Sequence, residues 1–116
     1  MRARLFLSGI HAEGRHGARP GEKDQAQPFV VDLDLEVEVG GDHIDETADY
    51  RGVSERVRAI VQEGSFDLIE MMAAEIAESC LAFPAIRRAM VVVHKPSAAT
   101  RLGIDGVAAA VTRPQE

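Results

Sequence analysis

The sequence is poor in the residues on which several classes of protein depend. It contains no tryptophan and one tyrosine, and aromatic residues make up only 4% of its 116 positions. Aromatic side chains provide the stacking platforms of single-stranded nucleic-acid binding, so this shortage argues against a nucleic-acid partner. The formal net charge of −6 argues the same, and it also argues against an anionic membrane surface.

Cysteine and long apolar runs are also scarce. Cys80 is the only cysteine, so no disulfide can form within the chain, and a reducing compartment is expected. No apolar run approaches the roughly 18–20 residues of a membrane span. The apolar segment that follows residues 1–4 is too short for a signal peptide. These features predict a cytoplasmic protein with no membrane partner.

The chain length predicts a single domain over residues 1–116, and a hydrophobic content of 46% suffices for a core. The clearest element is residues 29–39, where apolar and acidic residues alternate and predict a strand with one buried face. Three further strands are expected from shorter apolar segments, at 4–11, 87–94 and 106–112. The polar segments 11–28 and 97–105 are expected to be loops.

Helical spacing of apolar residues predicts two helices in the middle of the chain, over 50–62 and 66–80. Asp49 is placed to cap the first helix. The second carries an apolar stripe formed by Ile69, Met72, Ala73, Ile76 and Cys80. The resulting order is β-β-α-α-β-β. Because sequential strands favour hairpins, we predict an α+β fold, a four-stranded antiparallel sheet with two helices on one face.

A four-stranded sheet of this kind has two exposed edges and a second face that no helix covers. Unpaired edges invite pairing with other chains, and closure into a barrel removes them. The predicted fold therefore favours a homo-oligomer in which sheets join between subunits into a barrel-like assembly.

Glu70 lies near the start of the second predicted helix and has two interpretations. Asp67 and Glu70 fit a capping box, in which Asp67 is the N-cap and Glu70 is the reciprocal residue three positions on. Alternatively, Glu70 is a buried carboxylate, stabilised by the positive end of the helix dipole, that accepts hydrogen bonds from a ligand with two N–H donors. The helix pattern alone fits both interpretations.

Several short motifs, in order over nearly the whole chain, resemble those of the bacterial dihydroneopterin aldolase family, which has the tunnelling fold. They are Gly14-Arg15-His16-Gly17 followed by Glu22, the strand that begins at Phe29, Asp49-Tyr50, Leu68-Ile69-Glu70, and Val93-His94-Lys95-Pro96. Each motif is weak alone, but together, at these separations, they form a specific pattern.

The resemblance implies an enzyme of folate biosynthesis. Members of this family cleave 7,8-dihydroneopterin by a retro-aldol reaction into 6-hydroxymethyl-7,8-dihydropterin and glycolaldehyde, and they use no metal, Schiff base or cofactor. The protonated dihydropterin itself serves as the electron sink. Family members assemble as tetrameric rings that commonly stack into octamers, with active sites between subunits.

The same resemblance implies a role for each site residue. Glu70 would anchor the pterin through two charge-assisted hydrogen bonds, and the backbone of Ile69 would hold the ring beside it. Lys95 resembles the acid–base lysine of the family. Tyr50 resembles the tyrosine that reaches a neighbouring subunit's site and assists proton transfer at the reacting carbon. Glu22 resembles the carboxylate near the trihydroxypropyl side chain and the lysine.

Each of these side chains taken singly also fits a structural role. Taken alone, Lys95 is typical of an exposed charge at a strand end, and Glu22 is typical of a surface acid in a loop. Tyr50 alone reads as a partly buried aromatic residue at a helix start. Their occurrence together in one pattern favours the functional interpretation.

Other functions fit parts of the pattern. An epimerase of dihydroneopterin or its triphosphate would share the catalytic residues, and its candidates for binding the triphosphate are Arg15, Arg19 and Arg101. A non-catalytic pterin-binding protein would keep the fold without needing the acid–base residues. A zinc-dependent pterin synthase of the same fold would need a close His-x-His pair. The chain's histidines include no such pair; they are His11, His16, His43 and His94.

Overall fold

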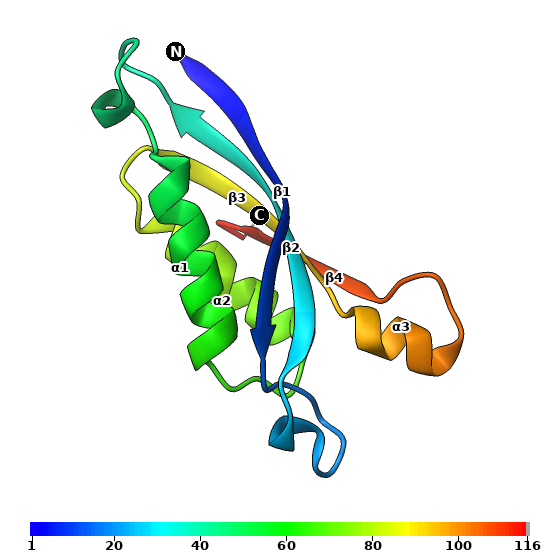
Figure 1. Cartoon of the computed structure of the whole chain (residues 1–116). Helices are drawn as coiled ribbons and strands as arrows, with labels where there is room; N and C mark the ends of the chain where they lie inside the picture. The colour runs from blue at the N-terminus through cyan, green and yellow to red at the C-terminus, as the bar shows by residue number, and fades with distance from the viewer. Residues whose placement is uncertain (116) are drawn as a thin grey trace.

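The computed structural model of the chain describes residues 1–115 and shows an α+β domain (Figure 1). One antiparallel sheet has the strand order β1-β2-β3-β4. Its strands are β1 (Arg2–Gly14), β2 (Gln27–Glu38), β3 (Ile86–His94) and β4 (Ala108–Arg113). Two helices, α1 (Tyr50–Glu63) and α2 (Ile69–Leu81), lie side by side on one face of the sheet. The predicted fold class is confirmed, and the predicted strands and helices occur in the predicted order, with one additional helix between β3 and β4.

The alternating pattern of β2 explains where the core lies. The apolar residues of this strand face the helices and are almost inaccessible to solvent; they are Phe29, Val31, Leu33, Leu35 and Val37. The acidic residues between them lie on the opposite face, because successive side chains of a strand alternate. β2 pairs with β1 on one side and β3 on the other, so it is one of the two inner strands of the sheet.

Both helices bury the apolar stripes that their spacing predicts. The buried residues of α1 are Val53, Val57 and Val61, and those of α2 are Met72, Ala73, Ile76, Ala77 and Cys80. Asp49 caps α1, since its side chain accepts a hydrogen bond from the backbone N–H of Arg51 at 3.0 Å. Burial raises the pKa of the Cys80 thiol to about 11, so Cys80 is an unreactive core residue.

The segment that follows β3 differs from the prediction. Residues 97–105 are not a simple loop, because a short helix, α3 (Pro96–Leu102), occupies most of them. Pro96 takes the first helical position, where its missing N–H is not needed, and Gly103 ends the helix in the left-handed conformation at φ 69°. α3 lies away from the layer formed by α1 and α2 (Figure 1).

The long connection between β1 and β2 is shorter than predicted, because β1 continues to Gly14. It contains one turn of 3-10 helix, η1 (Glu22–Asp24), and a second such turn, η2 (Ile44–Glu46), precedes α1. η1 and α3 project from the same end of the sheet, and α1 begins at the other end (Figure 1). None of the helices within residues 1–115 is long and apolar enough to cross a membrane.

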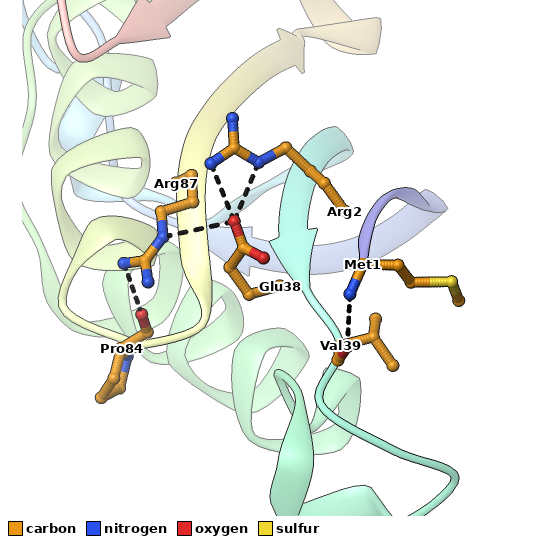
Figure 2. Close-up of polar contacts among 6 residues, drawn as sticks. All are labelled: Met1, Arg2, Glu38, Val39, Pro84 and Arg87. Carbon is orange, nitrogen blue, oxygen red and sulfur yellow. Dashed lines mark hydrogen bonds and ion pairs between the residues drawn. The ribbon is translucent and has the colours of Figure 1, made fainter.

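Polar contacts fasten the end of the sheet that lies away from η1 (Figure 2). Arg2 donates two hydrogen bonds to one carboxylate oxygen of Glu38, at 2.9 and 2.8 Å, and Arg87 Nε lies 3.8 Å from the same oxygen. The terminal amine of Met1 donates to the carbonyl oxygen of Val39 at 2.9 Å. These ion pairs are solvent-exposed, so each adds little stability, and the buried core carries most of the fold.

Candidate active site

A cleft of about 570 Å³ lies where η1, the start of α2, α3 and β4 meet. Four of the predicted site residues line it, namely Glu22, Ile69, Glu70 and Lys95. The cleft therefore brings together residues from opposite ends of the sequence, as the family pattern implies. Arg19 and Arg101 also line it, whereas Arg15 does not; its guanidinium binds the carbonyl oxygen of Asp24.

Glu22 and Lys95 form an ion pair in this cleft. Lys95 Nζ lies 2.8 Å from Glu22 Oε2. Only 3% of the Glu22 side chain and 13% of the Lys95 side chain are exposed. Lys95 is therefore not an exposed strand-end charge, and Glu22 is not a surface acid. A buried ion pair has to be well satisfied by further hydrogen bonds to be tolerated.

Those further hydrogen bonds come from Gln27 and Arg19. Gln27 Nε2 donates to Glu22 Oε2 at 3.1 Å, and the backbone N–H of Arg19 donates to Glu22 Oε1 at 3.2 Å. Although burial alone would raise the pKa of Glu22, the bonds from Lys95, Gln27 and Arg19 together lower it to about 2. The carboxylate is ionised at neutral pH. Its contribution to stability is present above its ordinary pKa of 4.5 and is lost as the pH falls toward 2.

The loop that carries Glu22 is fixed by a buried histidine. His16 is only 2% exposed, and its ring packs against Phe29 and Phe66. The backbone N–H of Phe66 donates to His16 Nδ1 at 3.1 Å, so Nε2 carries the proton and donates to the carbonyl oxygen of Val61 at 2.6 Å. Burial lowers the pKa of His16 and keeps the ring neutral. This ring joins the β1–β2 connection to the segment between α1 and α2.

The start of α2 differs from the capping-box prediction. α2 begins at Ile69, its N-cap is Leu68, and no side chain caps it. Asp67 instead forms an ion pair with Lys23, at 2.7 Å between Nζ and Oδ1. Glu70 is exposed rather than buried, and it makes no hydrogen bond or ion pair with any residue from 1 to 115. Its carboxylate therefore faces the cleft free to accept hydrogen bonds from a ligand.

Tyr50 is the one predicted site residue that the cleft does not contain. It is the first residue of α1, and 53% of it is exposed. The start of α1 lies at the end of the molecule opposite η1 (Figure 1). A single chain therefore does not bring Tyr50 to Glu22 and Lys95.

Comparison with known proteins identifies the family to which this arrangement belongs. The sequence model of the FolB dihydroneopterin aldolase family matches residues 5–112. The chain is also 34% identical over 114 residues to the dihydroneopterin aldolase of Streptomyces coelicolor, with 95% of this chain and 96% of that protein covered. The chain belongs to the dihydroneopterin aldolase family. The predicted resemblance is confirmed.

Solved dihydroneopterin aldolases have the same fold. The Escherichia coli enzyme in complex with neopterin superposes with a TM-score of 0.83 at 22% identity, over 96% of this chain and 98% of that chain. The enzyme of a Burkholderia species, bound to guanine, superposes with a TM-score of 0.81 at 28% identity, over 99% of this chain and 93% of that one. This chain thus has the FolB fold over nearly its full length.

Periodicity alone did not single out Gln27, Gly17 or the structural role of His16 as parts of this aldolase-family site. The sequence does contain a signal for Gln27. It stands two positions before Phe29, so the alternation of β2 predicts an apolar residue at position 27, and the polar residue there is an exception. Gly17 has φ 145°, and a Cβ at this position would lie 2.0 Å from Glu22 Cδ. The glycine therefore makes room for the Glu22 carboxylate.

Gly17→Ala is expected to displace Glu22 and break its pairing with Lys95. The added methyl group cannot share space with the carboxylate, and overpacking of this kind typically lowers the free energy of unfolding by about 1–3 kcal/mol. A denaturation midpoint measures the change. Gly106→Ala is the matched control, because a Cβ there has no heavy atom within 4 Å and its φ is not in the left-handed region. Equal midpoints for the two variants would contradict this role of Gly17.

Proposed function

We propose that this chain cleaves 7,8-dihydroneopterin by a retro-aldol reaction to 6-hydroxymethyl-7,8-dihydropterin and glycolaldehyde, as a cytoplasmic enzyme of folate biosynthesis. The observation that carries the proposal is the buried Glu22–Lys95 pair at 2.8 Å, in the same cleft as Glu70, whose carboxylate has no partner among residues 1–115. The cleft thus offers both an anchor for a polar ring and a group that can move a proton.

In this proposal the ring binds at the start of α2. The carboxylate of Glu70 accepts hydrogen bonds from the amino group and the adjacent N–H of the pterin, a charge-assisted bidentate contact. The backbone at Ile69 lies beside the ring, and the first N–H groups of an α-helix have no acceptor within the helix. The trihydroxypropyl side chain then points toward Glu22 and Lys95. That neopterin and guanine occur in solved structures of the family supports a ligand with this hydrogen-bonding edge.

In the proposed reaction, protons are transferred between the substrate and side chains of the protein. A proton leaves the hydroxyl on the second side-chain carbon, the bond between the first and second carbons breaks, and the electron pair passes into the dihydropterin ring protonated at N5. Glycolaldehyde departs, the first carbon is then protonated, and N5 loses its proton. We assign acid–base work to Lys95 with Glu22 beside it, and protonation of the carbon to Tyr50 of a neighbouring subunit. No metal and no Schiff base take part.

The direct test is to incubate the protein with 7,8-dihydroneopterin and separate the pterin products. We expect 6-hydroxymethyl-7,8-dihydropterin and an equal amount of glycolaldehyde, formed at the same rate after exhaustive chelation of metal. Formation of only the side-chain epimer would select the epimerase alternative, which shares these residues. Binding of the pterin without turnover would select the non-catalytic alternative.

Glu70→Ala is expected to weaken pterin binding by at least about 10-fold, because a hydrogen bond to a charged group contributes about 1.5–3 kcal/mol. Stability should change little, since Glu70 has no partner within residues 1–115. Pterin fluorescence titration and a denaturation midpoint measure the two effects. Glu75→Ala is the matched control, as an exposed glutamate of the same helix outside the cleft. Intact affinity with a stability loss of about 1 kcal/mol would make Glu70 a structural residue.

A further inference from the structure

Gln27 is the first residue of β2 and the only polar side chain in the row that faces the helices. The row continues with five apolar residues, which are Phe29, Val31, Leu33, Leu35 and Val37. Packing alone favours an apolar side chain at the start of this row as well. Packing of the core therefore does not explain why this position holds a glutamine.

The amide nitrogen of Gln27 has two partners. Nε2 donates to the carbonyl oxygen of His16 at 2.9 Å and to Glu22 Oε2 at 3.1 Å. Because both partners are acceptors, the amide cannot be turned over without placing its own oxygen against two oxygens. One bond thus reaches the part of the loop that the buried His16 ring fixes, and the other reaches the carboxylate that pairs with Lys95.

The amide oxygen of Gln27 is used by nothing in the described part of the chain. Oε1 is buried and has no hydrogen-bond partner among residues 1–115. A buried acceptor without a partner is unfavourable, and each such group in a folded protein calls for an explanation. A methionine would occupy the same space without this penalty, but it could donate to neither His16 nor Glu22. The side chain is therefore explained by its two donated bonds.

We propose that Gln27 is a positioning residue of this active site, which ties the Glu22 carboxylate to the loop fixed by His16 and so holds it in line with Lys95 Nζ. The proposal rests on the proposed aldolase function. Glu22 Oε2 accepts from Gln27 and from Lys95 at once, so a shift of the carboxylate moves the position at which the Lys95 amine is held. Gln27 does not line the cleft that holds Glu70 and Lys95, although it lines a second pocket that shares Glu22 with that cleft. Its proposed effect on the cleft is therefore exerted through Glu22.

Gln27→Met tests the proposal, because it keeps the length of the side chain and removes both donors. We expect kcat to fall by up to about 10²-fold, the size of effect that a misplaced catalytic group produces. KM and pterin affinity should change little, since Glu70 is untouched. Gln25→Met is the matched control, because Gln25 is exposed, lies two residues away and, among residues 1–115, has no hydrogen bond or ion pair with Glu22. Its kcat should remain that of the wild type.

A double-mutant cycle separates positioning from mere structure. If Gln27 acts through Glu22, then Gln27→Met added to Glu22→Gln should change kcat by no more than roughly twofold, whereas independent effects would multiply. If Gln27→Met lowers kcat in the Glu22→Gln background by the same factor as in the wild type, the proposal is overturned. So would an unchanged kcat in Gln27→Met alone.

Titration of Glu22 provides a readout that does not depend on turnover. The carbon-13 resonance of its carboxyl group, assigned by its loss in Glu22→Gln, should titrate at a higher pH in Gln27→Met than in the wild type, because a hydrogen bond to the ionised form is lost. An unmoved titration would overturn the proposal even if kcat fell. If the Glu22 titration moves in Gln27→Met but the wild-type protein produces no 6-hydroxymethyl-7,8-dihydropterin, the aldolase function alone is overturned.

If Gln27→Met does not fold, Gln27→Glu replaces it. This variant has the same shape, and it places a second carboxylate beside Glu22. Two carboxylates at this distance raise each other's pKa, so the Glu22 titration should move upward relative to that of the wild type. A Glu22 titration unchanged by a carboxylate at position 27 would show that the two side chains do not interact.

Discussion

Lys95→Ala is expected to lower the turnover of 7,8-dihydroneopterin by about 10²-fold or more, the usual size of lost general acid–base catalysis. Lys95 Nζ is the one lysine amine in the cleft, it lies 2.8 Å from Glu22 Oε2, and the side chain is 13% exposed. Pterin affinity should fall much less, because in the proposed site the ring is anchored at Glu70, which stands on another element. Single-turnover product formation and fluorescence titration measure the two quantities.

Two further variants separate chemistry from charge. Lys95→Ala leaves the buried Glu22 carboxylate without its cation, which destabilises the fold in its own right. Lys95→Arg keeps a positive charge beside Glu22, but a guanidinium does not release its proton in proteins, so turnover should be lost although the fold is retained. Lys23→Ala is the control, since Lys23 pairs with Asp67 and not with Glu22. Near wild-type turnover in Lys95→Arg would reduce Lys95 to an electrostatic role.

The elements that could be predicted from the sequence are those whose apolar residues repeat with a single regular spacing. The alternation in β2 and the helical spacing of α1 predict their elements to within two residues, because each buries one continuous apolar face. α3 has seven residues and only two buried ones, Ala98 and Ala99, so it has no stripe to detect. Such a short helix depends on its surroundings and on its end residues, Pro96 and Gly103.

The start of α2 shows a different limit. A capping box is a local rule, and Asp67 with Glu70 satisfies its spacing. In the structure Asp67 pairs instead with Lys23, a residue distant in sequence that the β1–β2 connection brings to the same place. Local rules cannot foresee a competing partner of this kind. The consequence matters for the proposed function, because the Glu70 carboxylate has no hydrogen-bond or ion-pair partner among residues 1–115.

The candidate site residues come from the family pattern and not from periodicity. Glu22 and Lys95 stand in a loop and at a strand end, where single charged residues usually remain in solvent. The structure places both in one buried pair and adds Gln27, whose only sequence signal is a polar residue in an apolar row. A polar residue at a position that the strand period assigns to the core is therefore a useful mark of a site.

A large effect on activity is also expected from the position of Tyr50. It is exposed at the start of α1 and lies outside the cleft that holds Glu22 and Lys95. β1 and β4 are the edge strands of the sheet formed by residues 1–115, so both edges are available for pairing with other subunits. Within the same residues, no helix layer covers the face opposite α1 and α2. We propose that the protein forms a tetrameric ring or an octamer in which Tyr50 of one subunit completes the cleft of its neighbour.

If this arrangement holds, two inactive variants should restore each other. Tyr50→Ala and Lys95→Ala are refolded together in equal amounts, so that some interfaces combine Tyr50 from one chain with Lys95 from the other. Random mixing gives roughly a quarter of all two-chain sites an intact set of residues, and activity should return to about that fraction of the wild-type value. Product formation measures the recovery, and each variant refolded alone is the control.

The size of the recovery distinguishes the alternatives. A site contained within one chain has no intact copy in any mixture of the two variants, so the mixed oligomers would stay as inactive as either parent. Mixing of the folded variants without unfolding should also give no recovery at first, because subunits must exchange before a new interface forms. Light scattering confirms that the mixture has the mass of the wild-type oligomer. Mixed oligomers of that mass without activity would contradict the placement of Tyr50 in its neighbour's site.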